Sequence, residues 1–281
     1  MIIVDYSQTV ISNIMAEIGN KKTYLEVNLI RHMVINTIRS HYKQFKDEYG
    51  DMTIACDSKK YWRKDFFPFY KANRKTNRQN DDIDWSGIFE VINSLTDDLV
   101  NHFPYSVIQV DQAEADDIIG TLVKNYYRQG KIMIVSSDKD FLQLQKYYNV
   151  YQYSPIQKKN LQIQNPNEYI KEHIMKGDRG DGIPNFLSDD DTFVTDKRSK
   201  KILKTKLEAW KNLDPTEFCN EKMYRGWKRN EQLVDLAHTP EDIKQKIVDQ
   251  YDTYEYNQRD KLLNYFIKNK LRNLTEHIGD F

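Results

Sequence analysis

The sequence of 281 residues lacks the features of membrane and secreted proteins. Its longest apolar runs are of four residues, as at 1–4. A membrane helix needs about 20 such residues, and a secretion signal also needs a longer apolar core. Only Cys56 and Cys219 are present, too few for a disulfide framework, and neither has His or Cys neighbours at zinc-site spacing. These absences predict a soluble protein of the cytoplasm with reduced thiols and no membrane partner.

A net charge is also absent, because 42 Lys and Arg are set against 42 Asp and Glu. By itself this balance argues against a nucleic-acid partner, which usually leaves an excess of basic residues. The charges are sorted into blocks, however. Residues 59–78 hold eight bases and one acid and 197–211 hold seven bases and one acid, whereas 81–98 and 111–117 hold six and four acids and no base. Any one block taken alone is equally typical of a solvated surface.

Short β-branched runs alternate with segments of helical spacing in the first half of the chain. The runs are 2–4, 53–56, 107–110 and 132–135, and the helical segments are 7–19, 25–49, 85–102 and 114–130. Apolar runs of this length between polar breaks suit strands that are buried on both faces of a parallel sheet. We therefore predict an α/β fold over residues 1–155, with a mostly parallel central sheet and helices on both faces.

Beyond residue 155 the strand pattern fades and helical spacing continues. The clearest helices are expected at 166–175, 199–210, 239–251 and 259–271. Residues 156–281 are therefore predicted to form a smaller helical region beside the sheet.

Acidic residues gather after the predicted strands, at the edge where α/β proteins bind ligands. A Gly-rich turn at 177–184 adds two more. The full set is Asp5, Asp57, Glu114, Asp116, Asp117, Asp138, Asp140, Asp178 and Asp181. A single acid at a strand end is more often a cap or turn former, and Asp117 is also open to that structural role. Nine acids on one edge need a compensating cation, and an oxygen-rich set without His or Cys favours Mg²⁺ over Zn²⁺, with Mn²⁺ as a substitute.

This acid set indicates a reaction as well as a ligand. Two metal ions held together can stabilise both the attacking and the leaving oxygens of phosphodiester hydrolysis. No Ser/His/Asp arrangement, reactive Cys motif, phosphate-binding P-loop or dinucleotide-binding motif is present to indicate another chemistry. The residues alone therefore predict a metal-dependent phosphodiesterase.

The basic segment that follows Asp57 interleaves bases with six aromatic residues between 58 and 75. Cations that neutralise phosphates, beside aromatic faces that stack on bases, are typical of a site for single-stranded nucleic acid. The alternative is that the aromatics pack inward and the bases face water. From this segment we predict contacts with nucleic acid by Arg63, Lys64, Tyr70, Lys71, Arg74 and Lys75.

The motifs, taken together and in order, resemble those of the 5′ nuclease family, which includes flap endonucleases and the 5′ nuclease domain of bacterial DNA polymerase I. The matching motifs are Asp5, E-A-D-D at 114–117, S-S-D-x-D-F at 136–141, G-D-x-x-D at 177–181, W-R-x-D-F at 62–66 and Y-K-x-N-R at 70–74. The resemblance covers the whole chain and is strongest to the ribonuclease H branch found in T-even bacteriophages.

The resemblance implies a magnesium-dependent 5′ to 3′ exonuclease and flap endonuclease with ribonuclease H activity. Such an enzyme removes RNA primers and adjacent DNA during lagging-strand replication. By motif, the first metal site would contain Asp5, Asp57, Glu114, Asp116 and Asp138, and the second Asp140, Asp178 and Asp181. The residues assigned to catalysis are Asp5, Asp57, Asp116, Asp138, Lys71 and Arg63. Arg63, Lys71 and Arg74 match the bridge region that contacts the scissile phosphate and the 5′ strand.

The same resemblance divides the chain into a nuclease domain at 1–155, with its basic bridge at 59–78, and a DNA-binding region at 156–281. The turn at 177–184 matches the start of a helical motif that grips duplex DNA, but 185–191 depart from the Gly-rich second hairpin of cellular members. We expect the duplex contacts to come from Lys197, Arg198, Lys200, Lys201 and Lys204.

The expected partners are an RNA–DNA hybrid and flap or nicked duplex DNA, with a single-strand DNA-binding protein or a sliding clamp as protein partners. A monomer in the cytoplasm of a phage-infected bacterium fits this role. Two alternatives stay open: a structure-specific DNA-binding protein of the same fold that does not cut, and a haloacid-dehalogenase-type phosphatase. The phosphatase would need a second acid at position 7, where this chain has Ser7.

The neutral total is compatible with a nucleic-acid partner once the acids are divided by role. Setting the nine predicted site acids aside leaves 33 acids against 42 bases, an excess of nine positive charges. The balance then describes an acidic metal site beside basic surfaces.

Overall fold

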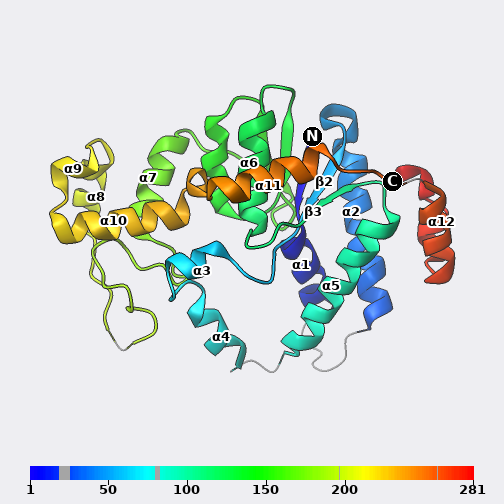
Figure 1. The fold of residues 1–281 in the computed structure, drawn as a ribbon, viewed down its shortest axis with the longest axis horizontal. Helices are drawn as coiled ribbons and strands as arrows, with labels where there is room; N and C mark the ends of the chain where they lie inside the picture. Colours follow the sequence, from blue (N-terminus) through cyan, green and yellow to red (C-terminus); the bar gives the residue numbers. More distant parts are fainter. Residues whose placement is uncertain (19–25, 80–82, 196, 258) are drawn as a thin grey trace.

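The computed structural model contains one six-stranded sheet, helices on both of its faces, and a further group of helices at one side (Figure 1). It describes residues 1–18, 26–79, 83–195, 197–257 and 259–281. None of the helices in these ranges is long and apolar enough to cross a bilayer.

The sheet has the order β3-β2-β1-β4-β5-β6. Its strands are β1 (Ile2–Asp5), β2 (Met52–Ala55), β3 (Ser106–Ile108), β4 (Ile132–Val135), β5 (Val150–Ser154) and β6 (Lys159–Leu161). The first five are parallel and β6 pairs antiparallel with β5. The chain builds outward from β1 to β3 and then crosses to the other side of β1 to form β4, so the carboxyl ends of β1 and β4 lie at the topological switch point of the sheet. The predicted fold class and its four strands are confirmed.

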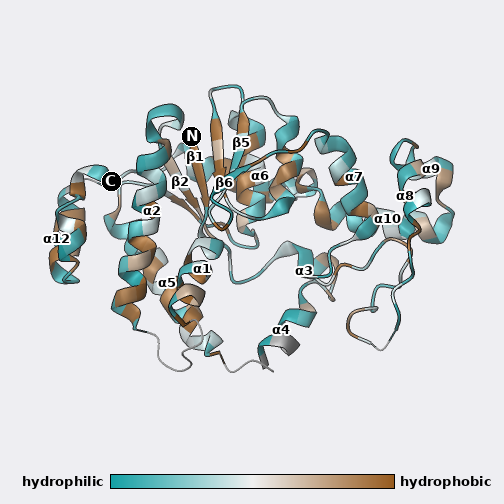
Figure 2. Ribbon diagram, turned by 180° about the vertical axis from the view of Figure 1, so that it is seen from behind, coloured by the Kyte–Doolittle hydropathy of each residue, from teal (hydrophilic) through white to brown (hydrophobic). Residues whose placement is uncertain are grey.

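Successive side chains of β1 point to opposite faces of the sheet. Ile2 and Val4 belong to one core and Ile3 to the other, and all three are fully buried. Strands that are buried on both faces read as continuous apolar runs, which is why the sequence shows them clearly. Figure 2 shows the same pattern, with hydrophobic strands at the centre and helices whose colours are mixed.

Five helices belong to the side of the sheet that Ile2 and Val4 face. They are α1 (Tyr6–Ile18), α2 (Val27–Tyr49), α5 (Trp85–His102), α12 (Arg259–Lys268) and α13 (Arg272–Thr275). The other side is covered by α6 (Ala115–Tyr126), α11 (Glu241–Asp252) and the short 3₁₀ helices η1 (Lys139–Lys146) and η2 (Leu236–His238). The chain ends with a short 3₁₀ helix, η3 (Ile278–Asp280), and Phe281 lies in the first core.

A third core lies beside the sheet and gathers segments from both halves of the chain. Its helices are α7 (Pro166–Lys176), α8 (Lys204–Lys211), α9 (Pro215–Phe218) and α10 (Glu221–Val234). The basic segment reaches it between its two short helices, α3 (Trp62–Phe66) and α4 (Ala72–Gln79). Phe67 and Tyr70 of the basic segment pack there with Ile174, Phe186 and Trp227. The aromatics of that segment therefore divide, because these two face the protein interior while Phe66 is exposed.

The predicted helices are present with shifted ends; α8, for example, begins at Lys204 and not at 199. The hairpin of β5 and β6 and the helix α10 were not predicted. The strand β6 lies past residue 155, and α11 to α13 return to the layers around the sheet. The division into 1–155 and 156–281 stays a prediction. Helices of the second part pack on both faces of the sheet.

His41 of α2 generates a test of stability against pH. It is buried, and neither ring nitrogen has a hydrogen-bond partner among the described residues. Burial lowers the pKa of His41 to about 4, whereas an unfolded histidine titrates near about 6.5. Between these values the unfolded chain binds the proton and the folded chain does not. The contribution of the neutral His41 to the free energy of unfolding is therefore complete above the pKa of the unfolded chain. It falls as the pH falls toward the pKa of the folded chain.

We predict that His41→Leu removes this part of the pH dependence. The parent's loss of unfolding free energy between pH 7.5 and pH 5 should exceed the variant's loss by about 2 kcal/mol. Urea unfolding of both proteins at the two pH values measures this difference. Equal losses in parent and variant would contradict the account of a buried neutral histidine.

Candidate metal centre and nucleic-acid interface

Three strands place acids at one edge of the sheet. Asp5 ends β1, Asp57 lies two residues beyond β2, and Asp138 lies three beyond β4. Because β1 lies between β2 and β4, the three carboxylates meet. Burial, followed by the charges of Asp57 and Asp138, raises the pKa of Asp5 to about 7. Asp111 follows the edge strand β3 and is exposed.

Local hydrogen bonds orient these carboxylates. Asp5 accepts hydrogen bonds from the backbone N–H of Gln8 at 3.1 Å and from the Ser136 hydroxyl at 2.9 Å. Asp57 accepts one from the backbone N–H of Ala115 at 2.8 Å. Ala115 is the first residue of α6, so the positive end of the helix dipole faces this carboxylate.

The first turn of α6 adds Asp116 to the same group. Its pKa is raised well above the usual range, first by burial and then by the charge of Asp138, with smaller contributions from Glu114 and Asp5. The charge of Lys71 opposes this shift. The structure therefore brings Asp5, Asp57, Asp116 and Asp138 of the predicted first set into one mutually repelling cluster. The fifth member, Glu114, has its carboxylate oxygens bonded to Arg63, Tyr70 and Lys71.

Asp117 points away from that cluster, and the prediction that it binds metal is wrong. It is fully buried. Its two oxygens accept hydrogen bonds from Arg63 at 2.8 Å, from the Thr239 hydroxyl at 2.7 Å, from the Trp62 indole at 3.2 Å and from the Glu114 backbone N–H at 2.9 Å. Burial alone would raise the pKa of Asp117, but the charge and hydrogen bond of Arg63 outweigh it and lower that pKa.

Arg63 is also buried, although the sequence analysis predicted that it contacts nucleic acid. Its side chain is 2% exposed and pairs with Glu114 at 2.9 Å as well as with Asp117. Its Nε donates to the backbone carbonyl of Leu233 at the end of α10. A guanidinium enclosed in this way cannot reach a phosphate, so the predicted catalytic and nucleic-acid roles of Arg63 are wrong. It joins the basic segment, α6 and the helical region.

Tyr70 is a further correction, because it is buried and its hydroxyl lies 3.0 Å from Glu114 and 3.0 Å from Asp181, which share its one proton. It positions acids and does not face nucleic acid. Lys71 lies beside it, 13% exposed, with its Nζ 2.5 Å from Glu114 and 3.6 Å from Asp181. Although burial lowers the pKa of Lys71, the charges of Asp181 and Glu114 outweigh it and raise that pKa.

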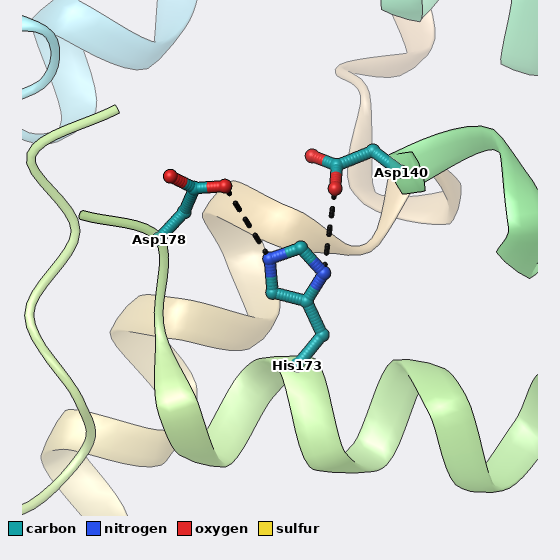
Figure 3. Close-up of side chains that lie close together, drawn as sticks. All are labelled: Asp140, His173 and Asp178. Carbon is teal, nitrogen blue, oxygen red and sulfur yellow. Dashed lines mark ion pairs between the residues drawn. The ribbon is translucent and has the colours of Figure 1, made fainter. Parts of the chain in front are cut away.

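A second acidic group forms where η1, α7 and the 177–184 turn meet (Figure 3). Burial raises the pKa of Asp140 to about 7, and the charges of Asp138, Asp178 and Asp181 act in the same direction. The Asp178 carboxylate accepts the backbone N–H of Asp181 at 3.0 Å. The predicted second set is therefore brought together, and it lies next to the first through Asp138.

His173 stands in this second group, contrary to the expectation that histidine is absent. Its Nδ1 lies 3.4 Å from Asp140, and its Nε2 lies 3.6 Å from Asp178. Burial lowers the pKa of His173, but the neighbouring carboxylates of Asp178 and Asp140 outweigh burial and raise it. The sequence signal was present but faint: His173 stands in the last turn of the helix before the G-D-x-x-D motif.

Exposed bases border the acids. Arg74 pairs with Asp181 and is 43% exposed. It lines a cavity of about 430 Å³ together with Lys71, Asp57, Tyr61 and other residues. Lys64 is exposed, whereas the side chain of Lys75 lies outside the described residues. Lys59 and Arg78 of the bridge line the same cavity. Of these cations, Lys71 and Arg74 pair with the acids of the site.

The second basic run lies on the helical region. Lys197, Arg198, Lys200, Lys201 and Lys204 are all exposed, which suits their predicted contact with duplex DNA; that role stays a prediction. Lys197 also pairs with Asp191 at 2.8 Å. With Lys176 and Arg179 it lines a cavity of about 460 Å³ beside the 177–184 turn.

The donors fit divalent metal ions. The carboxyl groups of Asp5, Asp116 and Asp140 have raised pKa values, first because they are withdrawn from water and then because neighbouring acids repel them. A cation among them would relieve that repulsion. Oxygen donors of this density are typical of hard divalent ions.

Two family models together match almost the whole chain. Residues 2–175 match the 5′-3′ exonuclease, N-terminal resolvase-like domain, and residues 165–281 match the C-terminal domain of T4 RNase H. The chain belongs to the 5′-3′ exonuclease family. It is 34% identical to the ribonuclease H of Enterobacteria phage T4, over 99% of this chain and 95% of that protein. A 5′-3′ exonuclease of Buchnera aphidicola is 29% identical over 54% of this chain and 53% of that one.

Solved structures of a bacteriophage T5 protein share the fold. The flap endonuclease of bacteriophage T5, in a complex with DNA and metal ions, superimposes with a TM-score of 0.67 at 16% identity, over 89% of this chain and 97% of that one. A second T5 structure, crystallised with metal ions, gives a TM-score of 0.62 at 17% identity, over 90% of this chain and 99% of that one. The chain is a 5′ nuclease, and the phosphatase alternative is excluded.

The buried position of Arg63 generates a stability test. Arg63→Met leaves Glu114 and Asp117 without their buried partner and should lower the free energy of unfolding by about 3–5 kcal/mol. Lys64→Met changes the exposed neighbour and should stay within about 0.5 kcal/mol of the parent. Urea unfolding of the three proteins measures both effects. Parental stability in Arg63→Met, combined with weaker binding of nucleic acid, would restore the phosphate role.

Proposed function

We propose that this 5′ nuclease uses two Mg²⁺ ions, with Mn²⁺ as a substitute, to remove RNA primers and adjacent DNA during lagging-strand replication. It would act as a 5′ to 3′ exonuclease and flap endonuclease with ribonuclease H activity. The observation that carries the proposal is the pair of adjoining acidic groups at the carboxyl edge of the sheet, bordered by Lys71 and Arg74.

Two sets of carboxylates would hold the ions. The first site would use Asp5, Asp57, Asp116 and Asp138 with Glu114 behind them, and the second Asp140, Asp178 and Asp181. When bound, divalent ions in such a pair stabilise both the attacking and the leaving oxygens of phosphodiester hydrolysis. The second set crosses the predicted boundary at residue 155, so catalysis would need both parts of the chain.

Lys71 and Arg74 would bind the phosphate that is cut and the 5′ strand beside it. Glu114 and Asp181, both held by the Tyr70 hydroxyl, fix the position of Lys71, so its ammonium is oriented before substrate arrives. The side chain of Lys71 is mostly enclosed, whereas that of Arg74 reaches further into solvent. Together they supply positive charge where the carboxylates alone would repel a phosphate.

The helical region would hold the duplex. The exposed bases at 197–204 and the cavity lined by Lys176, Arg179 and Lys197 offer positive charge to a phosphate backbone. The proposed substrates are an RNA–DNA hybrid and flap or nicked duplex DNA, bound by a monomer in the host cytoplasm. A single-strand DNA-binding protein or a sliding clamp as protein partner stays a prediction.

A DNA-binding protein of this fold that does not cut is the second candidate. The acidic cluster argues against this candidate, because several carboxyl groups with raised pKa values destabilise the folded chain unless a bound cation offsets their charge. Binding DNA alone does not require such a cluster.

We predict that a 5′-labelled RNA strand in an RNA–DNA hybrid is shortened from its 5′ end in Mg²⁺ and stays intact in EDTA. Asp138→Asn should slow the reaction by at least about a hundredfold, because a metal ligand loses its charge. Its binding of the hybrid in Ca²⁺ should stay close to the parent's. Gel analysis of time courses and filter binding measure the two quantities.

Asp111→Asn is the matched control, because Asp111 also lies three residues beyond a strand, but that strand is β3 at the edge of the sheet and not β4 beside β1. It should cut at the parental rate. A parent that binds the hybrid and leaves it intact in Mg²⁺ would support the DNA-binding alternative and contradict the nuclease assignment.

A further inference from the structure

His173 occupies a place that only oxygen ligands were expected to fill. Its ring lies between Asp140 and Asp178, with Nδ1 at 3.4 Å from one carboxylate and Nε2 at 3.6 Å from the other (Figure 3). One ligand atom from each of the three residues falls within 4.8 Å of the others. The His173 side chain is only 12% exposed, so it is part of the site and not a surface group.

Three elements fix this arrangement. Asp140 stands in the first turn of η1, His173 in the last turn of α7, and Asp178 in the turn that follows Gly177. Gly177 has a φ of +65°, and a Cβ there would lie 2.4 Å from the carbonyl oxygen of Ile183. The turn therefore returns tightly to α7 and keeps Asp178 beside the imidazole. The ring of Tyr169 contacts that of His173 edge-on, with 5.9 Å between centroids.

An imidazole changes which metals a carboxylate site prefers. Carboxylate oxygens suit Mg²⁺ and Mn²⁺, whereas imidazole nitrogen adds affinity for transition metals in the order Mn²⁺ below Co²⁺. A metal-bound histidine usually keeps a hydrogen bond from its other nitrogen to a carboxylate, which fixes the ring. His173 has a carboxylate at each nitrogen, so one contact can serve the metal while the other orients the ring.

We propose that His173 is a nitrogen ligand of the second metal site, with Asp140 and Asp178, and that this site consequently binds Mn²⁺ or Co²⁺ more tightly than Mg²⁺. The inference rests on the proposed function, because it refines one of the two metal sites of the nuclease. The metal preference of the second site would come from this one residue. The first site would bind its metal through oxygen ligands alone.

The direct test is pulsed electron paramagnetic resonance of the whole protein loaded with Mn²⁺ at pH 8, without nucleic acid. The spectrum of the parent should show modulation from a bound ¹⁴N nucleus. His173→Ala and His173→Gln should both lose it, the second keeping the side-chain volume and hydrogen bonding closer to the parent's. Tyr169→Phe, which keeps the ring contact, should retain it. Thermal unfolding confirms that each variant is folded.

Calorimetric titration with each metal alone supplies the second readout. His173→Ala should weaken Mn²⁺ and Co²⁺ at one site by about ten- to a hundredfold and weaken Mg²⁺ much less. A parent without ¹⁴N modulation would overturn the inference. So would an equal loss of Mn²⁺ and Mg²⁺ affinity, which would make His173 a residue that only positions the carboxylates.

Failure of the inference and failure of the proposed function are distinguishable. A parent that cuts the hybrid in Mg²⁺ but lacks ¹⁴N modulation overturns the histidine ligand alone. A parent that binds neither metal overturns both.

Discussion

The repulsion among carboxylates at the carboxyl edge of the sheet is the constraint on which the rest of the site depends. Parallel strands deliver Asp5, Asp57 and Asp138 to one place, and α6 adds Asp116. Burial and mutual charge raise the pKa of Asp5 to about 7 and that of Asp116 well above its usual range. Cations must offset this charge, and the chain supplies only some of them. The remaining negative charge is what a divalent ion would bind.

The cations of the basic segment are divided between two tasks. Arg63 is enclosed and pairs with Glu114 and Asp117, while its Nε bonds to the carbonyl of Leu233 in the helical region. This buried contact sets the bridge at a fixed place over α6, which leaves Lys71 and Arg74 at the edge of the cavity. Although the net charge of the chain is zero, its acidic and basic residues lie in different places. Acids converge at the carboxyl edge of the sheet, and exposed bases lie on the bridge and on the segment at 197–204.

The sequence predicted the parallel sheet and most site acids because apolar strands buried on both faces are continuous in sequence and end in the residues that face the ligand. It did not predict β5, where buried Gln152 and Ser154 interrupt the apolar pattern. The burial of Arg63 and Tyr70 and the structural role of Asp117 depend on contacts that are far away in the sequence. Arg63 bonds to Leu233 of α10, Asp117 accepts from Thr239 just after η2, and Tyr70 contacts Glu114 and Asp181. His173 was missed for the same reason, since only the fold brings it to Asp140.

The most direct test of the account is the free energy of urea unfolding of the parent and of Asp116→Asn at pH 8, each in EDTA and in saturating Mg²⁺. In EDTA the variant should be the more stable, because a carboxylate with a raised pKa destabilises the folded state at this pH and the amide does not. Mg²⁺ at a hundred times its Kd should stabilise the parent by about 2.7 kcal/mol per site and the variant by less, so the order of stability reverses. An unfolding free energy that Mg²⁺ leaves unchanged, or an order that is the same in both solutions, would contradict the account.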